Sequence, residues 1–412
     1  PSFPKRAYQA EYIVKTAQYI ASPDGGLQRF VRSVTAVFEG IPAEFPAEPA
    51  PAESDTAAFE KYQAQAKKAA ETHLDALIAR MQQLLGEDYY FVLRADLDMQ
   101  LRTIQKTLNS FGVRFDHWFS ERKLHVSGEV QQSLTQLDAT GHTKIEAGAL
   151  WLNTTTFGDE KDRVLVRDNG VATYFGADVA YHINKLDRGY DVLLDVWGAD
   201  HHGYIARVRA AIEALTQRKD ALEVQLMQFV TLASGKMGKR SGNFVTFQEL
   251  IDEVGRDATR FFFLMRSHDQ HLEFDMELAA SQSNDNPVYY VQYAHARVCS
   301  VMAQLAEKGL MFDQAQGLAH LSQLNDAHET KLLALLSRYP EAVQSAAQHR
   351  APHQLVNYLR ELADAFHSNY NAVKVLVDDN ALRHARVCLA LAARQTLANG
   401  LGLLGVSAPQ RM

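Results

Sequence analysis

The sequence contains little cysteine, with only Cys299 and Cys388 among its 412 residues. Two thiols cannot form a disulfide framework or a cysteine-based zinc site, which excludes a disulfide-rich secreted scaffold and a zinc-ribbon type of protein. Both cysteines lie in apolar helical patterns, so we expect each to be a buried small hydrophobic residue. We therefore predict neither a redox role nor a bound structural metal.

Long hydrophobic runs are also absent. No apolar stretch approaches the roughly 20 residues that cross a bilayer, and residues 1–6 lack the hydrophobic core of a secretory signal. These absences predict a cytoplasmic protein that has no membrane partner. The content of 47% hydrophobic and 22% charged residues is ordinary for a globular chain of two or three domains.

Charge is distributed unevenly along the chain. The net charge is −7, yet residues 285–412 contain 11 Lys and Arg against 10 Asp and Glu. The acidic total argues against a protein that coats nucleic acid indiscriminately. The C-terminal segment could nevertheless meet RNA without a global attraction.

The first part of the chain has mainly helical patterns. Apolar spacing predicts a short helix over residues 8–20, a long helix over 56–85 that ends at Gly86, and another helix over 95–111. Residues 41–55 are rich in Pro, Ala and Glu without periodicity, which predicts an extended connector. We expect mixed segments from there to residue 147.

The middle third has apolar, β-branched runs that alternate with helical stretches. Residues 149–155 and 163–167 predict strands, 177–185 a helix, and 192–198 a buried parallel strand followed by a helix over 202–215. This order is typical of βαβ units, which bind ligands at the carboxyl ends of their strands.

The last third is almost wholly helical. Leu, Ala and Val recur at a spacing of three to four residues over 288–404, which predicts a helix bundle as a separate domain.

The predicted strand over 192–198 runs into the segment Trp-Gly-Ala-Asp-His-His-Gly. Its glycines, Gly198 and Gly203, permit a tight turn. The side chains between them can offer donors and acceptors to a bound adenosine or amino acid; they are Asp200, His201 and His202. Paired histidines also cap helices, so a structural role stays open. Metal ligation is disfavoured because no third nitrogen or sulfur ligand follows at helical spacing.

Tyr174 and Asp178 are four residues apart and share one face of the helix that they begin. A carboxylate beside a phenol suits a guanidinium, because the carboxylate holds its planar fork of donors. An alternative is a carboxylate that only interacts with the helix dipole.

Residues 236–243 read Lys-Met-Gly-Lys-Arg-Ser-Gly-Asn. Lys236, Lys239 and Arg240 gather three cations between small residues, where the backbone can approach a triphosphate closely. A solvated basic loop is the alternative. The segment resembles the KMSKS loop with which class I aminoacyl-tRNA synthetases hold ATP.

Together these clusters resemble the bacterial arginyl-tRNA synthetases, and the resemblance covers essentially the whole chain. The matching stretches are 88–121, 149–163, 196–209, 228–266, 286–297, 381–383 and 403–412. The resemblance implies an α/β plus all-α fold, in which a partial class I Rossmann-type parallel sheet with helical insertions precedes an anticodon-binding helix bundle.

The domains that the resemblance implies are five. They are the end of the first half of the catalytic domain (1–30), a mainly helical insertion and connective region (31–147), the second half of the Rossmann-type domain (148–235), the KMSKS-like loop with a stem-contact region (236–284), and the anticodon-binding bundle (285–412).

The resemblance implies an arginine–tRNA ligase of protein biosynthesis. Such an enzyme activates arginine with ATP, supplied with Mg²⁺, to arginyl-adenylate, and transfers arginine to the 2′-hydroxyl of the terminal adenosine of its tRNA. Its partners would be L-arginine, ATP and the cognate arginine tRNA, and family analogy suggests a monomer.

Residue roles carried over from the family fall into three groups. Arginine would be bound by Tyr174, Asp178 and His201. ATP would be bound by Gly198, Asp200, His202, Gly203, Lys236, Met237 and Lys239, of which Lys236 and Lys239 would be catalytic. The tRNA would be bound by Tyr290, Tyr293 and Arg297. In the carboxy-terminal bundle, residues 289 and 293 share a helix face, as do 290 and 297. We expect one of these faces to be buried and the other exposed, with Tyr293 contacting RNA.

Two features depart from the family pattern. Gly238 stands where the motif usually has Ser, which predicts a modest change in loop closure. No HIGH sequence occurs in residues 1–412, so the chain resembles the carboxy-terminal two-thirds of a longer enzyme, and alone it should activate arginine poorly. A non-catalytic tRNA-binding paralogue is one alternative. A synthetase for another amino acid is a second, against which the Tyr174/Asp178 pair and the ending of the bundle argue.

Overall fold

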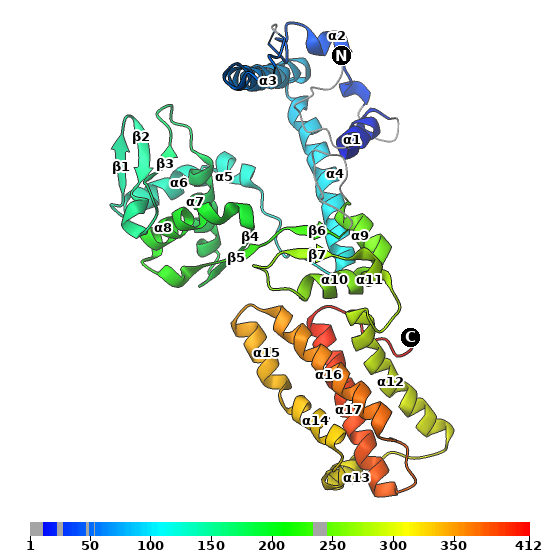
Figure 1. Ribbon diagram of the computed structural model, residues 1–412. Helices are drawn as coiled ribbons and strands as arrows, with labels where there is room; N and C mark the ends of the chain where they lie inside the picture. The colour runs from blue at the N-terminus through cyan, green and yellow to red at the C-terminus, as the bar shows by residue number, and fades with distance from the viewer. Residues whose placement is uncertain (1–10, 23–27, 47–48, 53, 234–244) are drawn as a thin grey trace. The chain divides into compact units, whose positions relative to one another are not determined.

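The computed structural model describes residues 11–22, 28–46, 49–52, 54–233 and 245–412. The chain divides into two compact units, Pro1–Arg114 and Phe115–Met412, which are described separately (Figure 1).

The first unit is helical in its described part. Its elements are α1 (Glu11–Ala21), η1 (Gln28–Phe30), α2 (Val34–Phe38), α3 (Thr56–Leu85) and α4 (Asp88–Phe111). The bounds predicted for α3 are confirmed: Asp55 caps its first turn by accepting from the Ala58 N–H, and Gly86 ends it with a positive φ. The helix predicted over 95–111 in fact begins at Asp88. Its first turns were missed because three successive aromatic residues, 89–91, do not show the alternation of apolar and polar residues that is typical of a helix.

The segment between α2 and α3 has no helix or strand in its described part, as predicted for a connector. It is nevertheless attached to α3. His73 Nδ1 lies 2.6 Å from the Pro42 carbonyl oxygen, and the Arg80 guanidinium pairs with Glu39 at 2.5 Å.

The second unit begins with two helices and a small antiparallel sheet. The elements are α5 (Glu121–Ser127), α6 (Glu129–Asp138), β1 (Thr143–Glu146), β2 (Ala149–Leu152), η2 (Thr154–Phe157) and β3 (Arg163–Val166). The prediction that 149–155 and 163–167 belong to βαβ units is wrong, because β2 pairs antiparallel with both β1 and β3. Strand β1 escaped prediction because its Thr-Lys-Ile-Glu sequence is mostly exposed and has no apolar run.

A true βαβ unit follows. Its elements are α7 (Tyr174–Asp187), β4 (Leu193–Gly198), η3 (Ala199–Tyr204), α8 (Ile205–Thr216), η4 (Lys219–Ala221) and β5 (Leu222–Met227). Strands β4 and β5 are parallel, with Leu193 opposite Leu222 and Gly198 opposite Met227, which confirms the predicted parallel strand. The prediction that this strand is buried is wrong, because its side chains alternate between the core and the exposed face. The core between α7, α8 and the strands contains Val179, Ile183, Val208, Ile212 and Leu222.

Helix α7 approaches β3 closely at Gly176. A Cβ atom at this position would lie 2.6 Å from the Leu165 carbonyl oxygen. Thr173 holds the same junction, because its hydroxyl donates to the Val164 carbonyl and accepts from the Gly176 N–H. The start of α7 is therefore fixed against β3 by backbone contacts.

We expect Gly176→Ala to lower the free energy of unfolding by about 1–3 kcal/mol, because neither the helix nor the carbonyl can move away without disturbing the junction. Calorimetric unfolding measures this effect. Gly402→Ala is the control: this helical glycine meets no atom within 4 Å, so alanine should leave the protein equally or more stable. Equal effects of the two substitutions would contradict the prediction.

A third part of the unit leads into the helix bundle. Its elements are β6 (Val230–Leu232), α9 (Phe247–Val254), α10 (Arg256–Leu264), β7 (Leu272–Phe274) and α11 (Met276–Ala280). Strands β6 and β7 are parallel, and Thr246 and Glu249 form a capping box at the start of α9.

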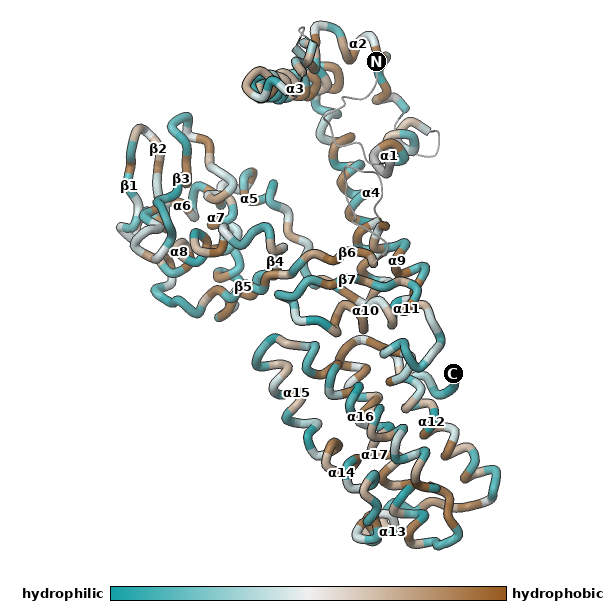
Figure 2. Tube along the Cα trace, viewed as in Figure 1, coloured by the Kyte–Doolittle hydropathy of each residue, from teal (hydrophilic) through white to brown (hydrophobic). Residues whose placement is uncertain are grey.

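The rest of the chain is a helix bundle, as its pattern predicted. The helices are α12 (Pro287–Glu307), α13 (Gln314–Ala319), α14 (Ala327–Ser337), α15 (Tyr339–Gln348), α16 (Pro352–Ala372) and α17 (Asn380–Leu403), with η5 (Leu321–Gln323) between α13 and α14. Figure 1 shows α12, α16 and α17 side by side, and Figure 2 shows hydrophobic residues alternating with hydrophilic ones along them. Val291, Leu332, Leu359, Phe366 and Leu397 lie in the core.

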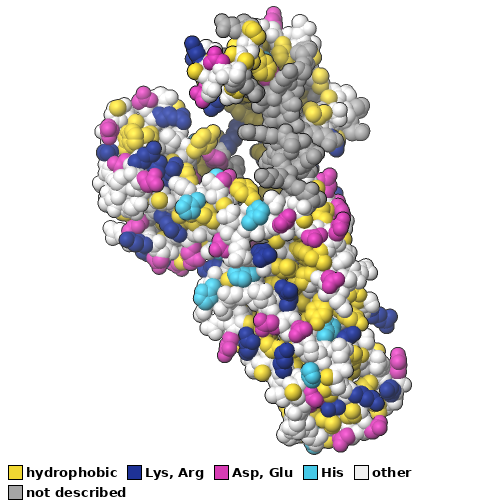
Figure 3. Space-filling model, viewed as in Figure 1, with side chains coloured by type: hydrophobic (Ala, Val, Ile, Leu, Met, Phe, Trp, Pro, Cys, Tyr) yellow, Lys and Arg dark blue, Asp and Glu magenta, His cyan; other side chains and the backbone are white. Residues whose placement is uncertain are grey.

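The surface of the bundle has mixed charge. Figure 3 shows Lys and Arg interspersed with Asp and Glu on its visible face.

Cys299 and Cys388 are half-buried, so the expectation that they are fully buried is wrong. Within the described ranges, we find no helix with the length and apolar character to cross a membrane.

Candidate active site

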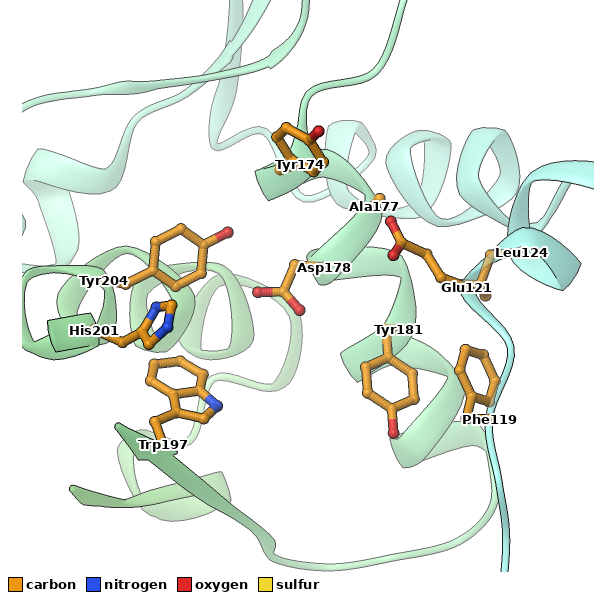
Figure 4. Close-up of a pocket in the computed structure, with 10 residues that line it drawn as sticks. All are labelled: Phe119, Glu121, Leu124, Tyr174, Ala177, Asp178, Tyr181, Trp197, His201 and Tyr204. Atoms are coloured by element: carbon orange, nitrogen blue, oxygen red, sulfur yellow. The ribbon is translucent and has the colours of Figure 1, made fainter. Parts of the chain in front are cut away.

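A cavity of about 530 Å³ lies beside α7, the carboxyl end of β4 and the segment that leads into α5. Its walls are largely aromatic, formed by Phe119, Tyr174, Tyr181, Trp197 and Tyr204. Figure 4 shows Tyr204, His201 and Trp197 on one side of the Asp178 carboxylate and Phe119, Glu121 and Tyr181 on the other. The cavity thus combines apolar walls with two carboxylates.

The first turns of α7 place Tyr174 and Asp178 at this cavity. Tyr174 is the first residue of the helix, and Asp178 follows one turn later. Both line the cavity, which confirms that they share a face of the helix they begin. The Tyr174 side chain is 85% exposed, whereas Asp178 is half-buried. The aromatic ring therefore stands at the rim and the carboxylate lies deeper.

Asp178 lies in an environment that disfavours an isolated negative charge. Burial raises the pKa of its carboxyl above the ordinary value, and the nearby His182 and a hydrogen bond from the Tyr204 hydroxyl only partly oppose this effect. Burial and the adjacent Asp178 also raise the pKa of the Tyr204 hydroxyl, so Tyr204 stays a donor. A cation that enters the cavity would stabilise the ionised carboxylate.

Glu121 and Tyr204 belong to the cavity but escaped prediction. Glu121 is the first residue of α5 and lies far from Asp178 in sequence, so no local pattern links the two carboxylates. Tyr204 ends the same turn that contains His201 and could have been found as the aromatic residue after Gly203. The second carboxylate could be found only from the packing of α5 against α7.

The turn after β4 contains the other predicted ligand-binding residues. His201 lines the cavity with its side chain 60% exposed. The remaining four residues, Gly198, Asp200, His202 and Gly203, are exposed and lie at the carboxyl end of β4, outside the cavity lining. A Cβ atom on Gly198 would lie 2.5 Å from Asp200 Oδ1, which is the end of an exposed side chain that can turn away.

The predicted triphosphate loop spans residues 236–243. Lys236, Met237, Gly238, Lys239 and Arg240 all lie outside the described residues. Within the described ranges, no three His, Cys, Asp or Glu side chains are grouped as a metal site would require.

The residues predicted to bind tRNA form one cluster on α12. Arg297 lies over the rings of both Tyr293 and Tyr370, at 4.6 and 4.7 Å from their centroids. It also donates to His367 and Asn371. The nearby Tyr290 hydroxyl donates to Asp364, 3.4 Å away.

The expectation that one of the two tyrosine faces is buried and the other exposed is wrong. Residues 289, 290, 293 and 297 are all half-buried. The reason is that α12 turns Val291, Ala294 and Val298 into the core, and the tyrosines flank this apolar face on both sides.

Comparisons with known proteins identify the family of the catalytic part and of the bundle. Residues 74–283 match the catalytic domain of class I tRNA synthetases (R), and residues 291–412 match the DALR anticodon binding domain. The chain is 49% identical over 415 residues to an arginine–tRNA ligase of Thioalkalivibrio sulfidiphilus, with all of this chain and 67% of that protein covered. The chain belongs to the arginine–tRNA ligase family.

Further members of the family agree with this assignment. A ligase of Halorhodospira halophila is 50% identical over 416 residues, again with 67% of its length covered. The solved arginyl-tRNA synthetase of Thermus thermophilus has the same fold, with a TM-score of 0.66 at 24% identity over 87% of this chain and 69% of that one. The resemblance and the predicted fold, a class I catalytic part followed by an anticodon-binding bundle, are thus confirmed. The chain spans about two thirds of the length of these relatives.

Proposed function

We propose that this chain acts as an arginine–tRNA ligase in cytoplasmic protein biosynthesis, working as a monomer on L-arginine, ATP and its cognate tRNA. The observation that carries the proposal is the aromatic cavity with two carboxylates, Asp178 and Glu121, in a chain about half identical to arginine–tRNA ligases. Membership of that family supports the reaction, and the cavity supports the amino acid.

Arginine fits the cavity by charge and by shape. A guanidinium is a planar fork of donors that a carboxylate can hold through two hydrogen bonds, and its flat face can rest against an aromatic ring. Asp178 would accept these bonds, with Glu121, Tyr174 and His201 around the same group. A lysine ammonium supplies the charge but not the fork. An uncharged side chain would leave Asp178 without a cationic partner inside the cavity, and such a mismatch is costly.

The turn after β4 would border the nucleotide. Gly198, Asp200, His202 and Gly203 are exposed at the carboxyl end of a parallel strand, which is where α/β sheets bind ligands. In the reaction, the arginine carboxylate attacks the α-phosphorus of ATP and pyrophosphate leaves. Lys236 and Lys239 would stabilise the charge on the departing pyrophosphate, and Mg²⁺ would enter as part of the ATP substrate.

The second step requires no nucleophile from the protein. The 2′-hydroxyl of the terminal adenosine attacks the carbonyl carbon of arginyl-adenylate, AMP leaves, and arginine remains esterified to the tRNA. The protein's part is to hold the guanidinium and the phosphates so that the two reacting groups meet.

The cluster on α12 would contact the anticodon loop. Tyr290 and Tyr293 offer aromatic faces, and Arg297 offers a positive charge between two rings. Unstacked bases of RNA loops bind such surfaces by stacking.

Tyr293→Ala should weaken tRNA binding by about 5- to 100-fold, because stacking one base on an aromatic ring contributes about 1–3 kcal/mol. Tyr293→Phe is the matched control, since it keeps the ring and removes only the hydroxyl, and it should bind tRNA nearly as well as the unchanged protein. Filter binding at fixed salt measures both dissociation constants. Equal losses in the two variants would show that the ring does not stack on RNA.

The decisive experiment measures arginine-dependent exchange of pyrophosphate into ATP, with and without tRNA, together with charging of arginine tRNA. We expect arginine to support exchange and charging, only weakly where residues 1–412 act alone, as the lack of a HIGH sequence predicts. Lysine, glutamine and cysteine should support neither. Lys236→Ala with Lys239→Ala should abolish exchange while arginine still binds. Binding of tRNA without any exchange or charging would overturn the proposed activity.

A further inference from the structure

His182 is a buried histidine whose two ring nitrogens both face oxygen atoms that can only accept. It lies on α7, one turn after Asp178, with 1% of its surface exposed. Its Nε2 is 2.7 Å from Oδ2 of Asp195 on β4, and its Nδ1 is 2.7 Å from the backbone carbonyl oxygen of Asp178. Neither oxygen carries a hydrogen at neutral pH, so both act only as hydrogen-bond acceptors.

A neutral imidazole has one N–H and one lone pair, so it can satisfy only one of these two oxygens. The other nitrogen would then direct its lone pair at an oxygen lone pair inside the protein, which is unfavourable. The imidazolium donates from both nitrogens and satisfies both contacts. The geometry therefore suits a His182 ring that carries a proton on each nitrogen.

The Asp195 carboxylate is built to support this charge. Its second oxygen, Oδ1, accepts from Lys185 Nζ at 2.7 Å. Burial disfavours the charged form of Asp195, but hydrogen bonds and charges from His182 and Lys185 outweigh it and hold the pKa of this carboxyl below its ordinary value. One carboxylate of β4 thus holds two cations of α7.

The same ring lies next to the carboxylate that faces the cavity. His182 Nδ1 is 3.8 Å from Asp178 Oδ1. The groups that act on the Asp178 carboxyl are His182 and Lys185 on its own helix, Asp195 on β4 and Tyr204 at the end of η3. Glu121 of α5 and His201 of η3 line the same cavity. An imidazolium at this distance favours the ionised form of Asp178 against the effect of burial.

We propose that His182 is a positioning residue that is held as an imidazolium between Asp195 and the Asp178 backbone, and that keeps the Asp178 carboxylate charged and directed at the guanidinium of the substrate. The proposal rests on the proposed function of the cavity. His182 itself does not line the cavity, so it acts on the substrate through Asp178.

The first test is the protonation of His182 in the unchanged protein, measured from the ¹⁵N chemical shifts of its ring at neutral pH. We expect both ring nitrogens to resonate in the protonated range, and the signal to be assigned by its loss in His182→Gln. One protonated and one unprotonated nitrogen would overturn the proposal. This measurement does not depend on arginine binding or on the stability of a variant.

The second test follows arginine affinity by calorimetry from about pH 4 to about pH 8 in the unchanged protein and in His182→Gln. Arginine binds the ionised Asp178, so affinity falls as the pH drops through the pKa of that carboxyl. Glutamine can still donate to Asp195 but has no charge, so the fall should move to higher pH by about one unit. His328→Gln changes an exposed histidine at the start of α14 and should move nothing.

The outcomes separate the two proposals. A uniform loss of affinity in His182→Gln, with the acid limb in its original place, would indicate mere structural damage and overturn the positioning role. If the unchanged protein bound no arginine at any pH, the proposed function of the cavity would be wrong and the positioning role would fall with it. The ring-nitrogen shifts would then still show whether the imidazolium exists.

Discussion

Asp178→Asn is expected to weaken arginine binding by about 30- to 1000-fold and to leave ATP binding within twofold of the unchanged value. Asparagine keeps the shape of the side chain but lacks the charge, and removing one partner of a hydrogen-bonded charge pair costs about 2–4 kcal/mol. Asp178 is the half-buried carboxylate of the cavity, so its charge is only partly screened by water. Calorimetric titration gives both dissociation constants.

Two variants serve as comparisons for this result. Asp187→Asn removes an exposed carboxylate from the last residue of the same helix and should change neither affinity. Glu121→Gln should have a smaller effect than Asp178→Asn, because the Glu121 side chain is 65% exposed and its charge is better screened. Equal losses of arginine and ATP affinity in Asp178→Asn would contradict the assignment of this residue to the guanidinium.

Asp195→Asn is expected to cause the largest loss of stability. Asp195 is 7% exposed and pairs with both His182 and Lys185 at 2.7 Å. Removing its charge leaves two cations with little solvent around them, and breaking a buried pair in this way costs about 3–5 kcal/mol. Calorimetric unfolding at neutral pH measures the loss, which should appear in the transition of the catalytic part.

The pH dependence of this stability has a definite direction. The pKa of the Asp195 carboxyl is lowered in the folded protein, because its hydrogen bonds and charge pairs outweigh the effect of burial. The stabilisation is therefore fully present above the ordinary pKa of an aspartate, about 3.9, and is lost as the pH falls through the lower folded value. The difference in stability between the unchanged protein and Asp195→Asn should accordingly shrink in acid.

An exposed ion pair gives the contrast. Arg218 and Asp220 lie 3.2 Å apart, with side chains 45% and 78% exposed. Asp220→Asn should not change the unfolding temperature measurably, because water and salt screen such pairs. A loss in Asp220→Asn as large as that in Asp195→Asn would show that burial of the His182–Asp195–Lys185 group does not matter.

The elements that the sequence predicted well are those whose signals are local. The 30-residue helix α3 has a capping Asp55 before it and Gly86 after it, and both ends were found because a cap depends on a few adjacent residues. Strand β4 and the helix after it were found because a β-branched run, a tight turn and an amphipathic helix follow one another directly, whereas the partner strand β5 was not predicted. The antiparallel pairing of β2 and β3 was missed, since strand direction depends on which partner strand each one meets.

By itself, the sequence determined that Tyr174 and Asp178 share a helix face, that His201 follows a parallel strand, and that the chain belongs with the arginine–tRNA ligases. The first two are consequences of spacing along one helix or one turn, and the third follows from the resemblance of long stretches over the whole chain. Only the tertiary structure decided that Glu121 joins Asp178 in one cavity and that His182 meets Asp195. Those contacts join residues of separate elements, and their distances are set by how α5, α7 and β4 pack rather than by any repeat in the sequence.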